Sequence, residues 1–382
     1  MLLTRHRLEN VKKIAVLRAN ALGDFIVTLP AIKAIHSTYP DAEIVLLGKP
    51  WHKEFLLAGR TPVDRVIVVP VSKGIRTEVN KVPDENEIKD FLGEMQKEHF
   101  DIVLNFQGKG IAANPFIKQF KAKKTAGITC EESEKLDFSL DYYYYQSEVI
   151  RYLEVAKLIG VTTFDLEPEI KVLQQDEEEV REFTCEVSKP FVVLHPIAID
   201  VRRMWPLENY AKLADKLRQK DLQVVFTGAK EDRTAVDAVI AEMDSTAINA
   251  CGNFSLGGLA ALLSHSTVMI SADTGPLHLG RAVGAPTIGF YWAPNLINWG
   301  PITRTIHHPL ISWNMACPIC GTVPNDPYPF EPKTEACDHE ISFVRDISIE
   351  QVLEAFESLL KKIKYSSSNN PETENRLKDI HK

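Results

Sequence analysis

Short apolar runs alternate with helical patterns along this chain, and this alternation limits its possible folds more than any other feature. The run Lys13–Arg18 has the length of a strand and ends at a glycine-containing turn over residues 19–24. A helical spacing of apolar residues follows from Ile26 to Ile35, and a second apolar run covers residues 42–47. Strand, turn, helix and strand in this order form a βαβ unit with parallel strands. The sequence therefore predicts an α/β fold.

A second series of the same kind begins with a strand at Phe191 and ends with one at residues 287–291. Before it, a helical pattern over residues 142–159 gives way at Gly160 to a stretch without periodicity that ends at Pro168. Glycine, proline and the loss of periodicity are typical of a linker between domains.

We therefore expect an N-terminal α/β domain over residues 1–168 and a C-terminal one over residues 169–364. A ligand is expected between them, at the carboxyl ends of the strands. The tail, residues 365–382, lacks apolar residues to bury and is expected to be disordered.

The composition agrees with two globular domains, since 45% of the 382 residues are hydrophobic and 25% are charged. A net charge of -8 disfavours a nucleic-acid partner, which is bound by neutralising phosphates. No run approaches the roughly 20 apolar residues that span a bilayer. Charges interrupt the N-terminal stretch where a signal peptide needs an apolar segment, so we expect a cytoplasmic location.

Several common catalytic motifs are missing from the sequence. Neither G-x-G-x-x-G nor the P-loop pattern occurs, which removes the main support for a dehydrogenase or a P-loop enzyme. There is no Asp-x-Asp pair to hold a metal ion against a sugar diphosphate, and no G-x-S-x-G nucleophile motif.

Residues 273–278, DTGPLH, lie where a strand turns into a helix. Backbone N–H groups at a helix start carry partial positive charge, so a diphosphate can bind there without metal. Thr274 adds a hydroxyl, and His278 is expected in the first helical turn. The alternative is that Asp273 or Thr274 only caps the helix and that His278 packs against the sheet.

Two further segments follow strands in the same way. The loop from His195 to Pro206 carries Arg202 and Arg203, and guanidinium groups bind phosphate oxygens in bidentate fashion. The alternative is a solvated charge on a loop. Asp24 follows the first strand and is either a general base or a helix N-cap.

Together these segments resemble glycosyltransferase family 9, whose best-known members are the ADP-heptose:lipopolysaccharide heptosyltransferases. The N-terminal segment matches the pattern R-x-x-x-x-G-D-x-x-x-x-L-P, the loop after Leu194 matches H-P-x-A followed by a basic residue and W-P, and the third segment matches A-D-T-G-P-x-H-L. The resemblance extends from about Lys13 to Lys362. It implies a GT-B architecture, in which two Rossmann-like domains face each other across a cleft.

The resemblance also implies roles for individual residues. Asp24 takes the place of the catalytic base, with Arg18 on the acceptor side, and Arg203 stands where the family has a donor-phosphate lysine. Ile197 and Ile199 depart from the family's H-P-G-A-[ST] motif, which removes a small residue and a hydroxyl. The remaining donor-binding residues implied by the resemblance are Gly228, Glu231, Asp273, Thr274, Gly275 and His278.

The function so implied is inverting transfer of a heptose or related sugar from a nucleotide diphosphate, ADP-heptose first, to a hydroxyl of the lipopolysaccharide core or another cell-envelope glycan. The donor is a co-substrate, no cofactor is required, and membrane contact is at most peripheral, at the inner face of the cytoplasmic membrane. The alternatives are a nucleotide-sugar 2-epimerase of similar fold and a non-catalytic protein that binds glycans or nucleotides.

Three of the six cysteines stand apart from the rest. Cys317 and Cys320 form a C-x-x-C pair, and Cys337 is followed by His339, so three thiolates and an imidazole are available for zinc. The spacing of the second pair is tight. We therefore expect no metal here and favour free thiols in a packing role, with zinc as the alternative.

Overall fold

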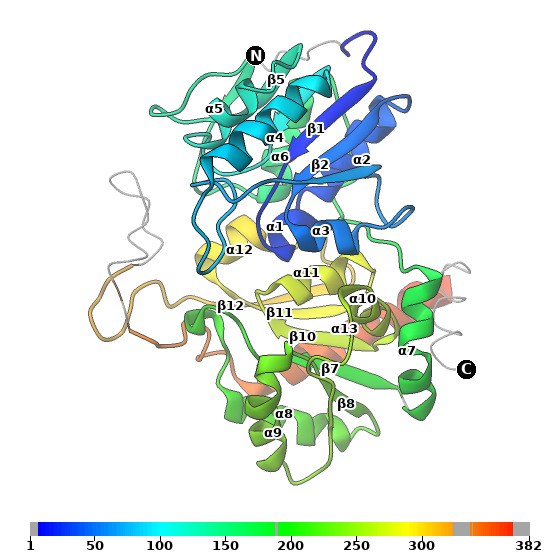
Figure 1. Ribbon diagram of the computed structural model, residues 1–382. Helices are drawn as coiled ribbons and strands as arrows, with labels where there is room; N and C mark the ends of the chain where they lie inside the picture. Colours follow the sequence, from blue (N-terminus) through cyan, green and yellow to red (C-terminus); the bar gives the residue numbers. More distant parts are fainter. Residues whose placement is uncertain (1–6, 188–189, 324–336, 338, 370–382) are drawn as a thin grey trace. The chain divides into compact units, whose positions relative to one another are not determined.

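The computed structural model describes residues 7–187, 190–323, 337 and 339–369. The chain divides into two compact units, unit 1 over Met1–Lys171 and unit 2 over Val172–Lys382 (Figure 1). The division falls after Lys171, whereas the boundary expected from the sequence follows Pro168.

Unit 1 contains a parallel sheet of six strands in the order β3-β2-β1-β4-β5-β6. The first strand, β1, lies between β2 and β4, so the strand order reverses there, as it does at the ligand-binding edge of doubly wound folds. The strands are β1 (Lys13–Leu17), β2 (Glu43–Gly48), β3 (Arg65–Val68), β4 (Ile102–Asn105), β5 (Lys124–Thr129) and β6 (Phe138–Asp141). The helices are α1 (Leu22–Ile26), α2 (Leu29–Thr38), α3 (Pro50–Phe55), α4 (Glu85–Lys97), α5 (Ala113–Lys118) and α6 (Glu148–Lys157).

Both faces of this sheet are covered, because the side chains of each strand alternate between them. Ala15 and Leu17 of β1 pack in one core with apolar residues of α4 and α5. Helices α2 and α6 contact each other, and the buried Ile14 and Val16 point to the opposite face from Ala15 and Leu17. Strands buried on both faces are near-continuous apolar runs, which is why β1 is so clear in the sequence.

Unit 2 repeats the plan with strand order β12-β11-β10-β7-β8-β9, again all parallel. Its order reverses at β7, which lies between β10 and β8. The strands are β7 (Phe191–His195), β8 (Gln223–Phe226), β9 (Ile248–Asn249), β10 (Val268–Ala272), β11 (Thr287–Trp292) and β12 (His307–Ser312). The helices are α7 (Gln174–Glu186), η1 (Val201–Arg203), α8 (Leu207–Arg218), η2 (Lys230–Asp232), α9 (Arg233–Ala241), α10 (Leu256–His265), α11 (Gly275–Ala282), α12 (Ala293–Trp299) and α13 (Ile349–Asn369).

The core of unit 2 lies between its sheet and helices α8, α9 and α13. Figure 1 shows α8 and α9 on one side of this sheet and α10 and α11 on the other. Trp205 is fully buried in this core, and its Nε1 donates a hydrogen bond to the backbone oxygen of Ile347 at 2.8 Å. The loop that precedes α8 is therefore fixed to the segment before α13.

Strands β5, β6 and β12 were not predicted from the sequence. Strands β6 and β12 lie at the edges of their sheets and are only partly buried, so they lack the apolar run of a central strand. Pro309 of β12 suits an edge, where one ladder partner is absent. In β5, KTAGIT, Gly127 is required because an added Cβ would lie 2.8 Å from Cβ of Asn105. The helical pattern expected over residues 142–159 is also shortened to α6.

The last helix extends beyond its expected end. Helix α13 continues to Asn369, so residues 365–369 are helical and the expectation that they belong to a disordered tail is wrong. The rest of that tail, residues 370–382, lies outside the described residues. Within the described ranges, no helix has both the length and the apolar character needed to cross a bilayer.

Candidate active site

Asp24 stands just past β1, in the first turn of α1. Its Oδ1 accepts a hydrogen bond from Arg18 Nη2 at 2.9 Å, and its Oδ2 accepts one from the backbone N–H of Ala21 at 3.0 Å. The N-cap of α1 is Ala21, so the N-cap alternative for Asp24 is wrong; Asp24 supports the helix start from the third helical position. Its side chain remains 24% exposed, so one carboxylate is both held in place and open to solvent.

Arg18 is the buried partner of this carboxylate, with a side chain only 3% exposed. Its Nε donates to the backbone oxygen of Asp24 at 2.9 Å and its Nη1 to that of Phe106, just past β4, at 2.6 Å. Burial opposes the charge of Arg18, but Tyr152, Asp24 and Glu148 raise its pKa above the ordinary value. With these donors engaged, Arg18 positions Asp24 and spans the point where the strand order of unit 1 reverses.

Helix α6 supplies a polar group that was not among the expected site residues. Tyr152 is buried, its ring lies 5.1 Å from the Arg18 guanidinium carbon, and its hydroxyl donates to Glu148 Oε2 at 2.5 Å. Glu148 is also ion-paired with Arg151. The signal available in the sequence was the i, i+4 spacing of Glu148 and Tyr152 on one helix face, but nothing local indicates that this face meets Arg18.

In unit 2, the start of α11 follows β10 directly. Thr274 is the N-cap, and its hydroxyl accepts a hydrogen bond from the backbone N–H of Leu277 at 3.4 Å. The hydroxyl also lies 3.1 Å from Oγ of Ser271. Thr274 is therefore the N-cap of α11, and Asp273 is not. Gly275 and Pro276 begin the helix, as expected from the fixed φ of proline.

Asp273 is the centre of a buried polar cluster at this helix start. Its Oδ1 lies 3.1 Å from His278 Nε2, and its Oδ2 accepts from Asn295 Nδ2 at 3.0 Å. Its backbone oxygen accepts from Arg203 Nη1 at 3.1 Å. Asn295, on α12, was not among the expected site residues, because only the fold brings the residues after β11 beside those after β10. We call Arg203, Asp273, His278 and Asn295 the donor cluster.

Two nitrogen atoms of the donor cluster are buried without a partner. Neither Arg203 Nε nor His278 Nδ1 has a hydrogen-bond partner in the described part of the chain. A buried polar group left unpaired costs about 1–3 kcal/mol. Arg203 Nε can only donate a hydrogen bond, so this atom of the cluster suits a ligand with acceptor atoms, such as a phosphate.

The neighbouring Arg202 is used differently. Its Nε and Nη2 each donate to the carboxylate of Asp200 at 2.8 Å, and Asp200 caps the η1 turn. Arg203, in contrast, is joined to the rest of the donor cluster by its hydrogen bond to the backbone oxygen of Asp273. Ile199, in the place of the hydroxyl residue of the family motif, is fully exposed.

The other expected donor residues follow β8. Gly228 is explained by packing, because an added Cβ would lie 2.9 Å from both the Cβ of Asp232 and the Sγ of Cys251. Glu231 is exposed on the η2 turn. Since β8, β7 and β10 are neighbours, the residues after these three strands lie along one edge of the sheet.

His195 ends β7 and is buried, with its Nδ1 3.1 Å from the hydroxyl of Thr227. Burial lowers the pKa of His195 to about 4. As pH falls below about 6.5, the unfolded chain takes up a proton at this residue and the folded chain does not. The contribution of His195 to the free energy of unfolding is therefore fully present above pH 6.5 and is lost as the pH falls from about 6.5 to 4. This loss amounts to on the order of 3 kcal/mol.

We expect the melting temperature to fall between pH 7 and pH 5, and to fall less in His195→Asn than in the parent. His99→Asn is the matched control, because His99 is exposed and its φ of 51° is one that asparagine tolerates. Calorimetric melts of the three proteins at both pH values check this. An equal pH dependence in the parent and in His195→Asn would contradict it.

The four metal-ligand candidates also come together, all in unit 2. One ligand atom from each of Cys317, Cys320, Cys337 and His339 lies within 4.8 Å of the others. The cysteines are free thiols.

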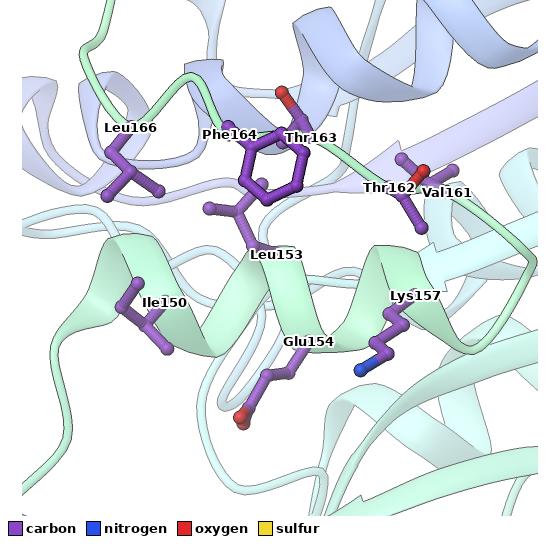
Figure 2. A pocket seen from close by; sticks show the side chains of 9 residues that line it. All are labelled: Ile150, Leu153, Glu154, Lys157, Val161, Thr162, Thr163, Phe164 and Leu166. Atoms are coloured by element: carbon purple, nitrogen blue, oxygen red, sulfur yellow. The ribbon is translucent and has the colours of Figure 1, made fainter. Parts of the chain in front are cut away.

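A separate pocket of about 310 Å³ lies between α6 and residues 161–166 (Figure 2). Figure 2 shows Ile150, Leu153, Glu154 and Lys157 along the helix on one side of it. These residues lie on the face of α6 that points away from Tyr152. The pocket is open and mainly apolar, and the carboxylate of Glu154 lines it together with Lys157, so it is a poor site for a diphosphate.

Two doubly wound sheets, one followed after β1 by the held carboxylate of Asp24 and the other by the donor cluster after β7 and β10, have the architecture of GT-B glycosyltransferases. The comparisons with known proteins agree. Residues 89–319 match the model of glycosyltransferase family 9 (heptosyltransferase). The chain belongs to this family and is a glycosyltransferase.

Among similar proteins is the lipopolysaccharide core heptosyltransferase OpsX of Haemophilus influenzae, 23% identical over 310 residues, which are 77% of this chain and 82% of the relative. A family 9 glycosyltransferase structure from Veillonella parvula superposes with a TM-score of 0.72 at 22% identity, covering 92% of this chain and 97% of that one. The E. coli ADP-heptose lps heptosyltransferase II gives a TM-score of 0.70 at 16% identity, covering 92% and 99%. These structures show the shared GT-B fold.

Proposed function

We propose that this protein is an inverting heptosyltransferase that moves a heptose from ADP-heptose to a hydroxyl of the lipopolysaccharide core. The observation that carries the proposal is the donor cluster, whose Arg203 Nε is buried beside the N-terminus of α11 without a partner in the described chain. A nucleotide diphosphate supplies acceptor oxygens for this N–H group and negative charge for the helix N-terminus. The family supports sugar transfer, and the names of the relatives support heptose and the lipopolysaccharide core.

Asp24 is the base in this proposal. As the acceptor oxygen attacks the anomeric carbon, its proton passes to the Asp24 carboxylate, and the bond from that carbon to the diphosphate oxygen breaks on the opposite face. Arg18 and the Ala21 N–H hold the carboxylate in one orientation, which reduces the entropy lost on reaching the transition state.

The donor cluster stabilises the leaving group. Negative charge grows on the diphosphate oxygen as the glycosidic bond breaks, and the guanidinium of Arg203 and the positive end of the α11 dipole would stabilise that charge. Asp273 holds His278 and the Arg203 guanidinium in place through its side chain and its backbone oxygen. Asp273 is therefore assigned a positioning role.

We also propose that the enzyme works in the cytoplasm at the inner face of the membrane, where a lipid-linked core acceptor is presented. Contact with that membrane is assigned as peripheral, since the described helices include no candidate span.

The proposal is tested with a panel of nucleotide sugars and a lipopolysaccharide-core acceptor lacking its heptose. ADP-heptose should raise the melting temperature and support transfer, while UDP- and GDP-sugars should do neither. Transfer should persist in EDTA, because Arg203 and the α11 N-terminus hold the diphosphate. Faster transfer from a UDP- or GDP-sugar would contradict the assignment of ADP-heptose as the donor. Activity that is lost in EDTA and restored by magnesium or manganese would contradict the proposal that the diphosphate is bound without metal.

A further inference from the structure

The segment from Cys317 to Thr322 forms a tight turn that brings two thiols together. The backbone N–H of Gly321 donates to the oxygen of Cys317, and the N–H of Cys317 donates to the oxygen of Thr322, both at 2.8 Å. Gly321 adopts a φ of 74°, which allows the chain to reverse directly after Cys320. The sulfur atoms of Cys317 and Cys320 are thus presented from one short loop.

Two more ligand atoms converge on this loop from a different part of the sequence. The Sγ atoms of Cys320 and Cys337 are 3.6 Å apart. The Nδ1 atom of His339 lies 3.5 Å from Sγ of Cys337 and 3.8 Å from Sγ of Cys317. Around a tetrahedral zinc ion, with bonds of about 2.3 Å to sulfur and 2.0–2.1 Å to nitrogen, ligand atoms are separated by about 3.5–3.8 Å. These three distances are those of zinc ligands, and all four ligand atoms lie within 4.8 Å of one another. A disulfide needs about 2.05 Å between its sulfur atoms.

Packing alone does not explain the arrangement. Cys317 and Cys337 are buried in the core of unit 2, as free cysteines often are, but Cys320 is exposed. An exposed thiol gains nothing from apolar packing, yet its sulfur is directed at Cys337. His339 directs a ring nitrogen at two sulfur atoms, although thiols are weak hydrogen-bond partners.

We propose that Cys317, Cys320, Cys337 and His339 bind one Zn²⁺ in a tetrahedral Cys₃His site with a structural role. Four protein ligands leave no open position, and the thiol protons pass to solvent when the ion binds. Three thiolates and an imidazole suit zinc better than magnesium or calcium, which require oxygen ligands.

The site lies where it can stabilise the loop that carries Arg203. Beyond His339, the backbone N–H of Phe343 donates to the oxygen of Arg202 at 2.7 Å, and Ile347 accepts from Trp205. A zinc ion would link the turn at residues 317–322 to this segment across a long intervening stretch of chain. The proposal of a zinc site does not depend on which sugar or nucleotide the enzyme uses.

The test is the metal content of the full-length protein, purified without chelators and freed of any histidine tag. Inductively coupled plasma mass spectrometry should find about one zinc ion per chain. Cys320→Ser should lose most of that zinc, and because Cys320 is exposed the core should remain intact, as circular dichroism will show. The matched control is Cys185→Ser, which replaces another exposed free cysteine outside the cluster and should retain the full zinc content.

Cobalt provides a readout of ligand geometry. Protein reconstituted with Co²⁺ should show thiolate-to-cobalt charge transfer and the strong visible bands of tetrahedral coordination, and both should weaken in Cys320→Ser. Parent protein that holds no zinc, even after dialysis against zinc under reducing conditions, would overturn the proposal. So would equal zinc content in Cys320→Ser and Cys185→Ser, whereas iron found in place of zinc would overturn the choice of ion.

Discussion

Replacing Asp24 with Asn is expected to lower the rate of sugar transfer by about 10²- to 10⁴-fold, the usual contribution of a general base. Asparagine has nearly the same shape and its oxygen can still accept from the Ala21 N–H, but it cannot take a proton from the acceptor. The affinity for ADP should remain close to that of the parent, because the donor cluster belongs to unit 2. Steady-state transfer assays and calorimetry with ADP measure the two quantities separately.

The same substitution removes the ion pair of the buried Arg18, so a lower melting temperature is expected as well. The rate is therefore compared at a temperature where circular dichroism shows both proteins folded. Asp41→Asn is the control, since Asp41 is an exposed carboxylate in a long contact with Lys12, and its loss should leave the rate unchanged. If Asp24→Asn transfers sugar at the parent rate, Asp24 only supports the start of α1.

Replacing Arg203 with Ala is expected to weaken ADP binding on the order of 10- to 150-fold. A hydrogen bond from a charged group is worth about 1.5–3 kcal/mol, and every 1.4 kcal/mol changes the affinity tenfold. Arg203 Nη1 is fixed on the backbone oxygen of Asp273, which leaves the buried Nε available to the diphosphate. Calorimetry with ADP tests this without knowledge of the acceptor.

Arg202→Ala is the matched control for this prediction. It removes the same charge from the adjacent position, but Arg202 is paired with Asp200, so the loss of ADP affinity should be much smaller. Equal losses in both variants would mean that only the net charge of the loop matters. Unchanged binding in Arg203→Ala, together with weakened binding in Asp24→Asn, would place the donor on unit 1.

The central strands could be predicted because burial on both faces produces continuous apolar runs, as in β1, β7 and β10. Edge strands such as β12, with two histidines and a proline, carry no such signal. The helical spacing over residues 142–159 predicted a helix, but Tyr142 to Ser147 precede α6. Periodicity describes only the neighbours of a residue in the sequence, so it could not indicate where this helix begins.

The sequence by itself determined the α/β class, the two series of βαβ units and the polar segments that follow β1, β7 and β10, because these depend on short-range patterns. It could not distinguish Arg203 from Arg202 by chemistry, since both are arginines on one loop. Only the tertiary structure pairs Arg202 with Asp200, directs Arg203 to Asp273 and brings Asn295 to the same carboxylate. These contacts depend on β10 lying beside both β7 and β11, and the order of strands in a sheet is decided by packing between distant segments.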